Sequence, residues 1–236
     1  MNDTCKLIRE HCSIRSYNAT KIKSNEIDEI IDCALRGATA GNMMMYSIIK
    51  ITNKSNLEYL SKKCDNQNFI KSSGFALVFL CDSHKFYQYF RYRNIDGISP
   101  SIVDCMLGIQ DVMIAAQNSV IAAESMGIGT CYIGDIMENY EDIKKHLNLP
   151  KYVFPVSMVV YGRYDSLLNK RDRFLKEHIV FDEKYPNISE DFINEMFKGK
   201  ELIRKDYANH IYNFKINSKF YQEMIRSINL YLNDWK

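Results

Sequence analysis

The feature that most constrains the fold is a long apolar segment at residues 100–126. Apolar side chains occur nearly all the way round the helix that this segment would form, so the helix cannot lie on a solvent-exposed surface. Small residues recur along it, namely Gly108, Ala115, Ala116, Ala122 and Ala123. We expect a helix that is buried in a core or a subunit interface, and Gly127 can end it in the left-handed conformation.

Short apolar runs at residues 46–51, 75–81, 130–133 and 156–161 predict strands around this helix. Residues 75–81 are apolar without interruption, which is typical of a central strand buried on both faces. Helical segments separate the runs, and Ser55 with Glu58 has the pattern of a capping box for one of them. The alternation predicts a mixed α/β or α+β domain. Strand patterns fade after Gly162, so the rest of the chain is expected to be helical or irregular.

The composition is that of a globular protein, with 46% hydrophobic and 25% charged residues. Basic residues (31) nearly balance acidic ones (29), so we expect no nucleic-acid partner and no membrane association. The seven cysteines are odd in number and contain no C-x-x-C pair, which argues against a disulfide framework and a zinc site. We therefore expect a cytoplasmic protein without a metal.

A polar cluster near the N-terminus contains His11, Ser13 and Arg15 at alternate positions. In an extended segment alternate side chains share one face, so all three could point at one anion, with the Arg15 guanidinium as a bidentate donor. The alternative is a solvated polar turn. A second basic cluster contains Lys170, Arg171 and Arg173; by itself it is a solvated charge run, and together with Arg15 it could surround a phosphate.

Two segments rich in small residues are further candidates for a site. Residues 38–42 (ATAGN) permit close approach and supply hydrogen-bond donors, although a helix C-cap at Gly41 or Asn42 is the commoner explanation for such a segment. Residues 127–134 (GIGTCYIG) end on Gly134, where the backbone could approach a flat ligand. The alternative for this segment is a structural turn, and it is no dinucleotide fingerprint because it follows a helix instead of opening one.

Aromatic and basic residues interleave at residues 86–93 (FYQYFRYR). Such a stretch could stack on single-stranded nucleic acid, but an amphipathic helix or an active-site cover is the commoner case. The chain contains no G-x-S-x-G, H-E-x-x-H or P-loop motif. Its five histidines are scattered, so no acid–base constellation is predicted.

Taken in order, these elements resemble the nitroreductase family. The resemblance rests on HCSIRSY at residues 11–17, ATAGN at 38–42, AAQNSVIAAESMGIGTCYIG at 115–134 and LPKYVFPVSMVVYG at 149–162. It implies an α+β fold with a mixed, mainly antiparallel central sheet flanked by helices, in a homodimer. Residues 1–165 would be the FMN-binding core, and residues 166–236 a C-terminal helical extension that packs on the core and the partner subunit.

The resemblance also implies roles for individual residues in binding FMN. His11, Ser13 and Arg15 would hold the phosphate and ribityl chain, and Arg171 and Arg173 would complete the phosphate site. Thr39 and Gly41 would lie near the ribityl chain and ring of the FMN that the other subunit mainly binds. Gln67 would contact the ring, and the backbone of Ile133, Gly134 and Asp135 would face it.

The function implied is that of an FMN-dependent oxidoreductase, which passes electrons from NADPH or NADH to nitroaromatic, quinone or flavin acceptors by a ping-pong mechanism. No catalytic side chain is expected, since the chemistry belongs to the cofactor. Met43, Met44 and Met45 stand where relatives often have glutamine or aromatic residues, which leaves the acceptor open. Two alternatives remain: a flavin protein of the same fold with another redox role, dehalogenase-like or a sensor, and a non-enzymatic binding domain that uses residues 86–93.

Overall fold

The computed structural model describes residues 2–166 and 170–236, which form two compact units. The first unit contains the described residues up to 166 together with residues 223–236, and the second contains Lys170–Gln222. The end of the chain thus belongs to the first unit. The assignment of residues 1–165 to FMN binding and of residues 166–236 to an extension stays a prediction.

A single antiparallel sheet organises the first unit, with the strand order β1-β2-β4-β3. The strands are β1 (Tyr46–Ile51), β2 (Phe75–Asp82), β3 (Gly129–Ile133) and β4 (Val153–Gly162). Every residue of β2 and β4 is buried, as their uninterrupted apolar sequences predict for central strands. The edge strands are β1 and β3. Sheet and helices together confirm the α+β class.

Helices make up most of the rest of the structure. The α-helices are α1 (Asp3–Glu10), α2 (Ser24–Leu35), α3 (Lys54–Lys63), α4 (Asn68–Ser72), α5 (His84–Tyr92), α6 (Ile102–Ser125), α7 (Tyr140–His146), α8 (Glu190–Ile203), α9 (Tyr207–Ile211) and α10 (Lys219–Leu232). Short 3-10 turns are η1 (Ala40–Asn42), η2 (Gly134–Met137), η3 (Lys176–His178) and η5 (Asn233–Trp235), and η4 (Tyr212–Ile216) is a π-helical turn.

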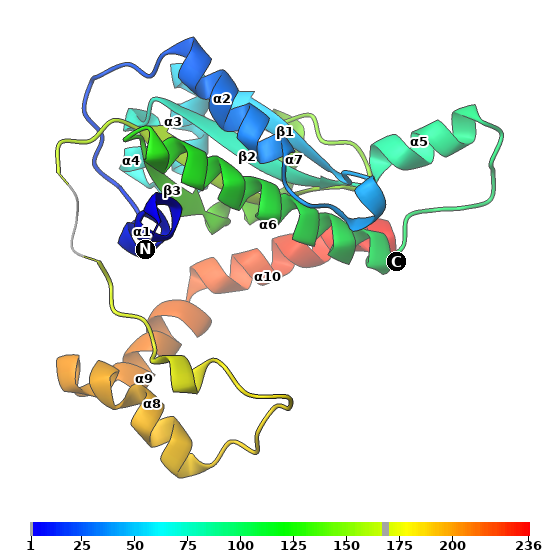
Figure 1. Ribbon diagram of the computed structural model, residues 1–236. Coiled ribbons are helices and arrows are strands. Elements are labelled where there is room, and N and C mark those ends of the chain that lie inside the picture. The colour runs from blue at the N-terminus through cyan, green and yellow to red at the C-terminus, as the bar shows by residue number, and fades with distance from the viewer. Residues whose placement is uncertain (1, 167–169) are drawn as a thin grey trace. The chain divides into compact units, whose positions relative to one another are not determined.

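The long helix α6 lies on one face of the sheet beside α2 (Figure 1). Gly108 lets the two layers approach closely, because a Cβ there would lie 2.6 Å from the Cys81 sulfur and 2.9 Å from the Met45 carbonyl oxygen. Of the helices in the described chain, α6 is the one that could cross a membrane by length and composition, but it serves as a core helix here. The prediction of a buried helix is confirmed for this side of α6.

The opposite side of α6 is exposed and apolar. Val103 is 60% exposed, Met106 53% and Met113 41%, and these residues recur at intervals of three and seven along the helix. A stripe with this spacing is typical of a seam between two helices. Nothing in the described part of one chain covers it.

Within the first unit, the end of α10 and η5 pack on the other elements through aromatic side chains. The ring of Tyr231 lies 5.0 Å from that of Phe154, and the Trp235 indole donates to the Ser83 hydroxyl over 3.3 Å. Tyr231 and Trp235 are both buried. The second unit has its own small aromatic cluster, in which the Phe174 and Phe197 rings are 5.2 Å apart.

Candidate functional site

The N-terminal cluster is held against the edge strand β3 by one backbone hydrogen bond. Ile14 is buried, and its N–H donates to the Thr130 carbonyl over 2.8 Å. In the segment from His11 to Tyr17, which forms no helix or strand, Ile14 is buried, Ser13 is half-buried and Arg15 is exposed. A shared face for His11, Ser13 and Arg15 stays a prediction.

His11 differs from its neighbours because it contacts the end of α6. Its Nδ1 lies 2.7 Å from Oε1 of Glu124, and the same carboxylate oxygen accepts a hydrogen bond from the Thr130 hydroxyl over 2.8 Å. His11 is the C-cap residue of α1, and its backbone N–H donates to the Ile8 carbonyl. The pair ties the N-terminal segment to both α6 and β3.

Ser13 and Arg15 meet the side chain of Cys131 on β3. Burial raises the pKa of the Cys131 thiol, and the positive charge of Arg15 and hydrogen bonds with Ser13 and Arg15 partly offset that rise. The Arg15 guanidinium carbon also lies 5.9 Å from the centre of the Phe69 ring, at the outer limit of a cation–π contact. Arg15 is exposed and its charge is available to an anion.

A second contact joins α4 to the end of β3. Gln67 is the N-cap residue of α4, and its Nε2 donates to Oδ2 of Asp135 in η2. Phe69 lies two residues after Gln67, so the contacts of Arg15 and Gln67 bring three distant segments to one place. These segments are residues 13–15, 67–69 and 131–135.

Gly134 leaves its backbone open at this place. A Cβ added to it would meet one side-chain atom, the Met137 methyl at 3.9 Å. Ile133, the last residue of β3, is buried, whereas Gly134 and Asp135 are half-buried. The uncrowded backbone of Gly134 lies on the same stretch, residues 131–135, that the Gln67 amide, the Ser13 hydroxyl and the Arg15 guanidinium contact. Such a place is suited to a flat ligand that carries an anionic group.

Glu138, the residue that follows η2, carries an unusual carboxyl group. Glu138 is buried and its Oε1 has no hydrogen-bond partner. Burial first, and then the negative charges of Asp135, Asp65 and Glu223, raise its pKa to about 8. Sequence analysis missed both Glu138 and Phe69. The position of Phe69 near Gln67 is a signal that could have been used, whereas the burial of Glu138 has no local sequence signal.

Thr39 and Gly41 belong to a segment that leads into the other edge strand, β1. Buried Asp111 on α6 holds this segment by accepting the Ala40 N–H over 3.0 Å and the Met45 N–H over 3.3 Å. Gly41 has a φ of +57°, which favours glycine. Because β1 and β3 are opposite edges of the sheet, one chain does not bring Thr39 and Gly41 to Arg15 and Gly134.

Arg171 and Arg173 belong to the second unit, and both are exposed. Between them, the Asp172 carbonyl accepts a hydrogen bond from Lys200 over 3.2 Å. This contact fixes the backbone and leaves the guanidinium groups to solvent. The convergence of these arginines with Arg15 on one phosphate stays a prediction. No group of three or more His, Cys, Asp or Glu among the described residues is arranged to hold a metal ion.

Comparisons with known proteins identify the family of the chain and relatives of the same fold. Residues 8–163 match the model of the Nitroreductase family. A "CR(VI) reductase" of Pseudomonas sp. (strain G-1) is 36% identical over 66% of this chain and 65% of its own length. An "FMN reductase (NADPH)" of Bacillus subtilis is 29% identical over 100% of this chain and 96% of its own length. The solved structure of NfrA1 nitroreductase from B. subtilis has a TM-score of 0.82 at 27% identity and covers 99% of this chain and 96% of its own. The chain belongs to the nitroreductase family.

Proposed function

We propose that this protein is an FMN-dependent oxidoreductase that takes electrons from NADPH or NADH and passes them to a nitroaromatic, quinone or flavin acceptor. The observation that carries the proposal is the convergence of Ser13, Arg15, Gln67 and Asp135 beside the open backbone of Gly134. The names of the relatives, an FMN reductase that uses NADPH and a nitroreductase, support the same activity.

The donors at this place fit FMN by their chemistry. Arg15 offers an exposed guanidinium for a phosphate, with Ser13 beside it as a hydroxyl donor. Gln67 and the backbone at Ile133, Gly134 and Asp135 can hydrogen-bond the polar edge of a flat ring. His11 would complete the N-terminal side, and Arg171 and Arg173 would add positive charge from the second unit. When bound, FMN supplies a ring that accepts hydride and gives it up again.

The side chains act by binding and orienting. Asp135 accepts the Gln67 amide N–H, which fixes the direction of the amide and leaves its carbonyl oxygen for a ligand donor. Arg15 neutralises the phosphate. Donor and acceptor would use one face of the site in turn, which gives ping-pong kinetics. No side chain is assigned a catalytic role.

A homodimer explains two features of the chain. The apolar stripe on α6 requires a cover, and a second copy supplies an identical stripe. Thr39 and Gly41 enter from the β1 edge, so in a dimer they would approach the FMN held by the β3 edge of the partner. A site that needs both edges is complete only when two copies meet.

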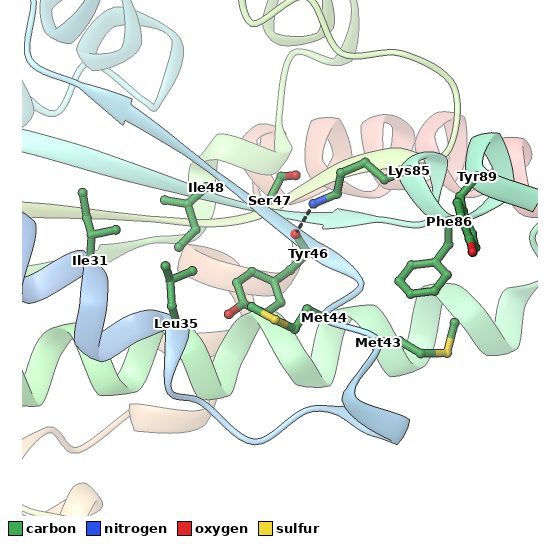
Figure 2. A pocket seen from close by; sticks show the side chains of 10 residues that line it. All are labelled: Ile31, Leu35, Met43, Met44, Tyr46, Ser47, Ile48, Lys85, Phe86 and Tyr89. Atoms are coloured by element: carbon green, nitrogen blue, oxygen red, sulfur yellow. Dashed lines mark hydrogen bonds between the residues drawn. The ribbon is translucent and has the colours of Figure 1, made fainter. Parts of the chain in front are cut away.

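Residues near the β1 edge are our candidates for the walls of the acceptor pocket (Figure 2). Met43 and Met44 offer adaptable thioether surface, and α5, with Phe86 and Tyr89, is our candidate for a cover over the acceptor pocket.

The seven cysteines are free thiols, which supports a cytoplasmic location. The near-neutral charge supports the absence of nucleic-acid and membrane partners.

An absorbance spectrum of the purified protein tests this function. The expected result is a flavin spectrum that NADPH or NADH bleaches under anaerobic conditions and that an added quinone restores. A yellow protein that neither nicotinamide bleaches would instead indicate a flavin protein with another redox role. A colourless protein that does not take up FMN would refute the proposal.

A further inference from the structure

The pair formed by His11 and Glu124 lies where the N-terminal segment meets the end of α6. Helix α1 packs beside α6 (Figure 1), and His11 at its end brings Nδ1 to 2.7 Å from Oε1 of Glu124. The buried Thr130 donates its hydroxyl to the same carboxylate oxygen over 2.8 Å. The side chains of His11 and Glu124 are 27% and 14% exposed. A shielded carboxylate with two partners can fix the direction of the imidazole ring.

The contact decides which nitrogen of His11 carries a proton. An ionised carboxylate can only accept a hydrogen bond, so Nδ1 must be the donor to Glu124. In a neutral imidazole Nε2 is then an acceptor, and it cannot bind a phosphate oxygen, which is an acceptor too. In an imidazolium both nitrogens donate. A charged His11 therefore suits a phosphate, whereas a neutral His11 suits a hydroxyl group that donates to it.

The surroundings of the ring favour the charged form. A carboxylate at hydrogen-bond distance stabilises an imidazolium. The titratable groups in the wall of the small cavity beside the pair, of about 100 Å³, are Glu10, Cys12, Glu124 and Tyr164. Burial first, and then the nearby Cys12 and Glu124, raise the pKa of Tyr164, so its hydroxyl stays neutral. Arg15, in the same segment as His11, is a positive charge that acts against the imidazolium, so the negative charge of Glu124 is needed.

From this geometry we propose that Glu124 is a positioning residue that holds His11 in its doubly protonated form, and that His11 in this form binds the phosphate of FMN and not its ribityl hydroxyls. This role rests on the proposed function, because it requires FMN at the site of Ser13 and Arg15. It gives His11 one chemical partner and makes FMN affinity depend on a proton. Affinity should fall as the pH rises and the ring loses its second proton.

The test is the dissociation constant of FMN between about pH 7 and about pH 9, a range in which a phosphate monoester stays doubly charged. The flavin-loaded protein is diluted in steps, and the anisotropy of flavin fluorescence reports the bound fraction. The dissociation constant of the native protein should rise about threefold to tenfold over this range. A histidine that binds a ribityl hydroxyl would leave it unchanged.

Glu124→Gln keeps the size of the side chain and an oxygen acceptor, and removes the charge. At pH 7 it should bind FMN about threefold to tenfold more weakly than the native protein, and its dissociation constant should change less than about twofold up to pH 9. His11→Gln should also give a flat profile. Cys12→Ser is the matched control, because it removes a thiol from the wall of the same cavity and leaves the pair intact. It should keep the native profile.

Circular dichroism would establish that the variants are folded, and His11→Gln decides by the same profile if Glu124→Gln does not fold. The role of Glu124 is overturned, while the proposed function stands, if the native protein binds FMN equally well at every pH. It is also overturned if Glu124→Gln or His11→Gln keeps the native profile, or if Cys12→Ser flattens it. A native protein that takes up no FMN would overturn the proposed function and this role together.

Discussion

The carboxylate of Asp111, buried in the middle of α6, accepts the backbone N–H of Ala40 over 3.0 Å. Its other oxygen accepts the Met45 N–H over 3.3 Å, so one side chain fixes both ends of the segment that carries Gly41. The segment contains backbone with positive φ at Gly41, Asn42 and Met44, a conformation that needs support from outside.

Asp111→Ala should therefore release this segment. The buried Met45 N–H and the half-buried Ala40 N–H would lose their acceptor, and we expect the free energy of unfolding to fall by about 2–4 kcal/mol in urea denaturation. Gln110→Ala is the control, because Gln110 is the exposed neighbour on the same helix. Equal stability of the two variants would contradict the role given to Asp111.

Removal of the Arg15 guanidinium should empty the flavin site. Loss of a charge-assisted hydrogen bond costs about 1.5–3 kcal/mol, so Arg15→Ala should bind FMN about 10–150-fold more weakly while staying folded. The measurement is the ratio of flavin to protein after gel filtration, followed by titration with FMN. Arg9→Ala on α1 is the matched control. Native flavin content in Arg15→Ala would argue against a phosphate at this position.

Glu138 should make stability depend on pH. Its pKa is raised to about 8 in the folded protein, so between the ordinary carboxyl value and pH 8 the folded state holds a proton that the unfolded state has lost. The free energy of unfolding should fall across this range as the pH rises, by up to about 5 kcal/mol. Glu138→Gln should flatten the dependence and be the more stable protein at pH 8, whereas Glu10→Gln should leave the native slope. An unchanged slope in Glu138→Gln would show that this carboxyl does not titrate there.

A charge in the apolar stripe of α6 should prevent dimerisation. Met106 is 53% exposed and lies within the stripe, so Met106→Glu would place two carboxylates in the seam between copies. Sedimentation should show a dimer for the native protein and a monomer for the variant, with loss of bound flavin. Leu202→Glu, at an 82% exposed position of the second unit, should remain a dimer. If Met106→Glu remained a dimer, the interface between copies would not be the apolar stripe of α6.

The sequence predicts the fold well where burial is complete. Residues 75–81 are uninterruptedly apolar because β2 is buried on both faces. The small residues of α6 are explained at Gly108, where the helix touches the sheet too closely for a side chain.

The predicted start of α3 is wrong. Asn53, not Ser55, caps the helix by accepting the Ser55 N–H over 2.8 Å, and Glu58 pairs with Lys62 instead. Local patterns fix a helix better than they fix its first residue.

The candidate site is harder to predict from the sequence than the fold, because segments that are distant in the chain form it. The spacing of Ser13 and Arg15 predicted a shared face, but the partner of His11 is Glu124, far along the chain on α6. Burial of Glu138 and the approach of Phe69 to Arg15 arise only when β3 and α4 meet. The binding roles carried over from the family resemblance stay predictions.

The order of the strands has a genetic consequence. Since Arg15 and Gly41 approach from opposite edges of the sheet, each site of a dimer would draw one of them from each chain. Co-expression of two inactive proteins, one altered at Arg15 and the other at Gly41, would yield mixed dimers in which one site inherits both defects and the other inherits neither. Complementation between two defective alleles is therefore the outcome expected of the proposed dimer.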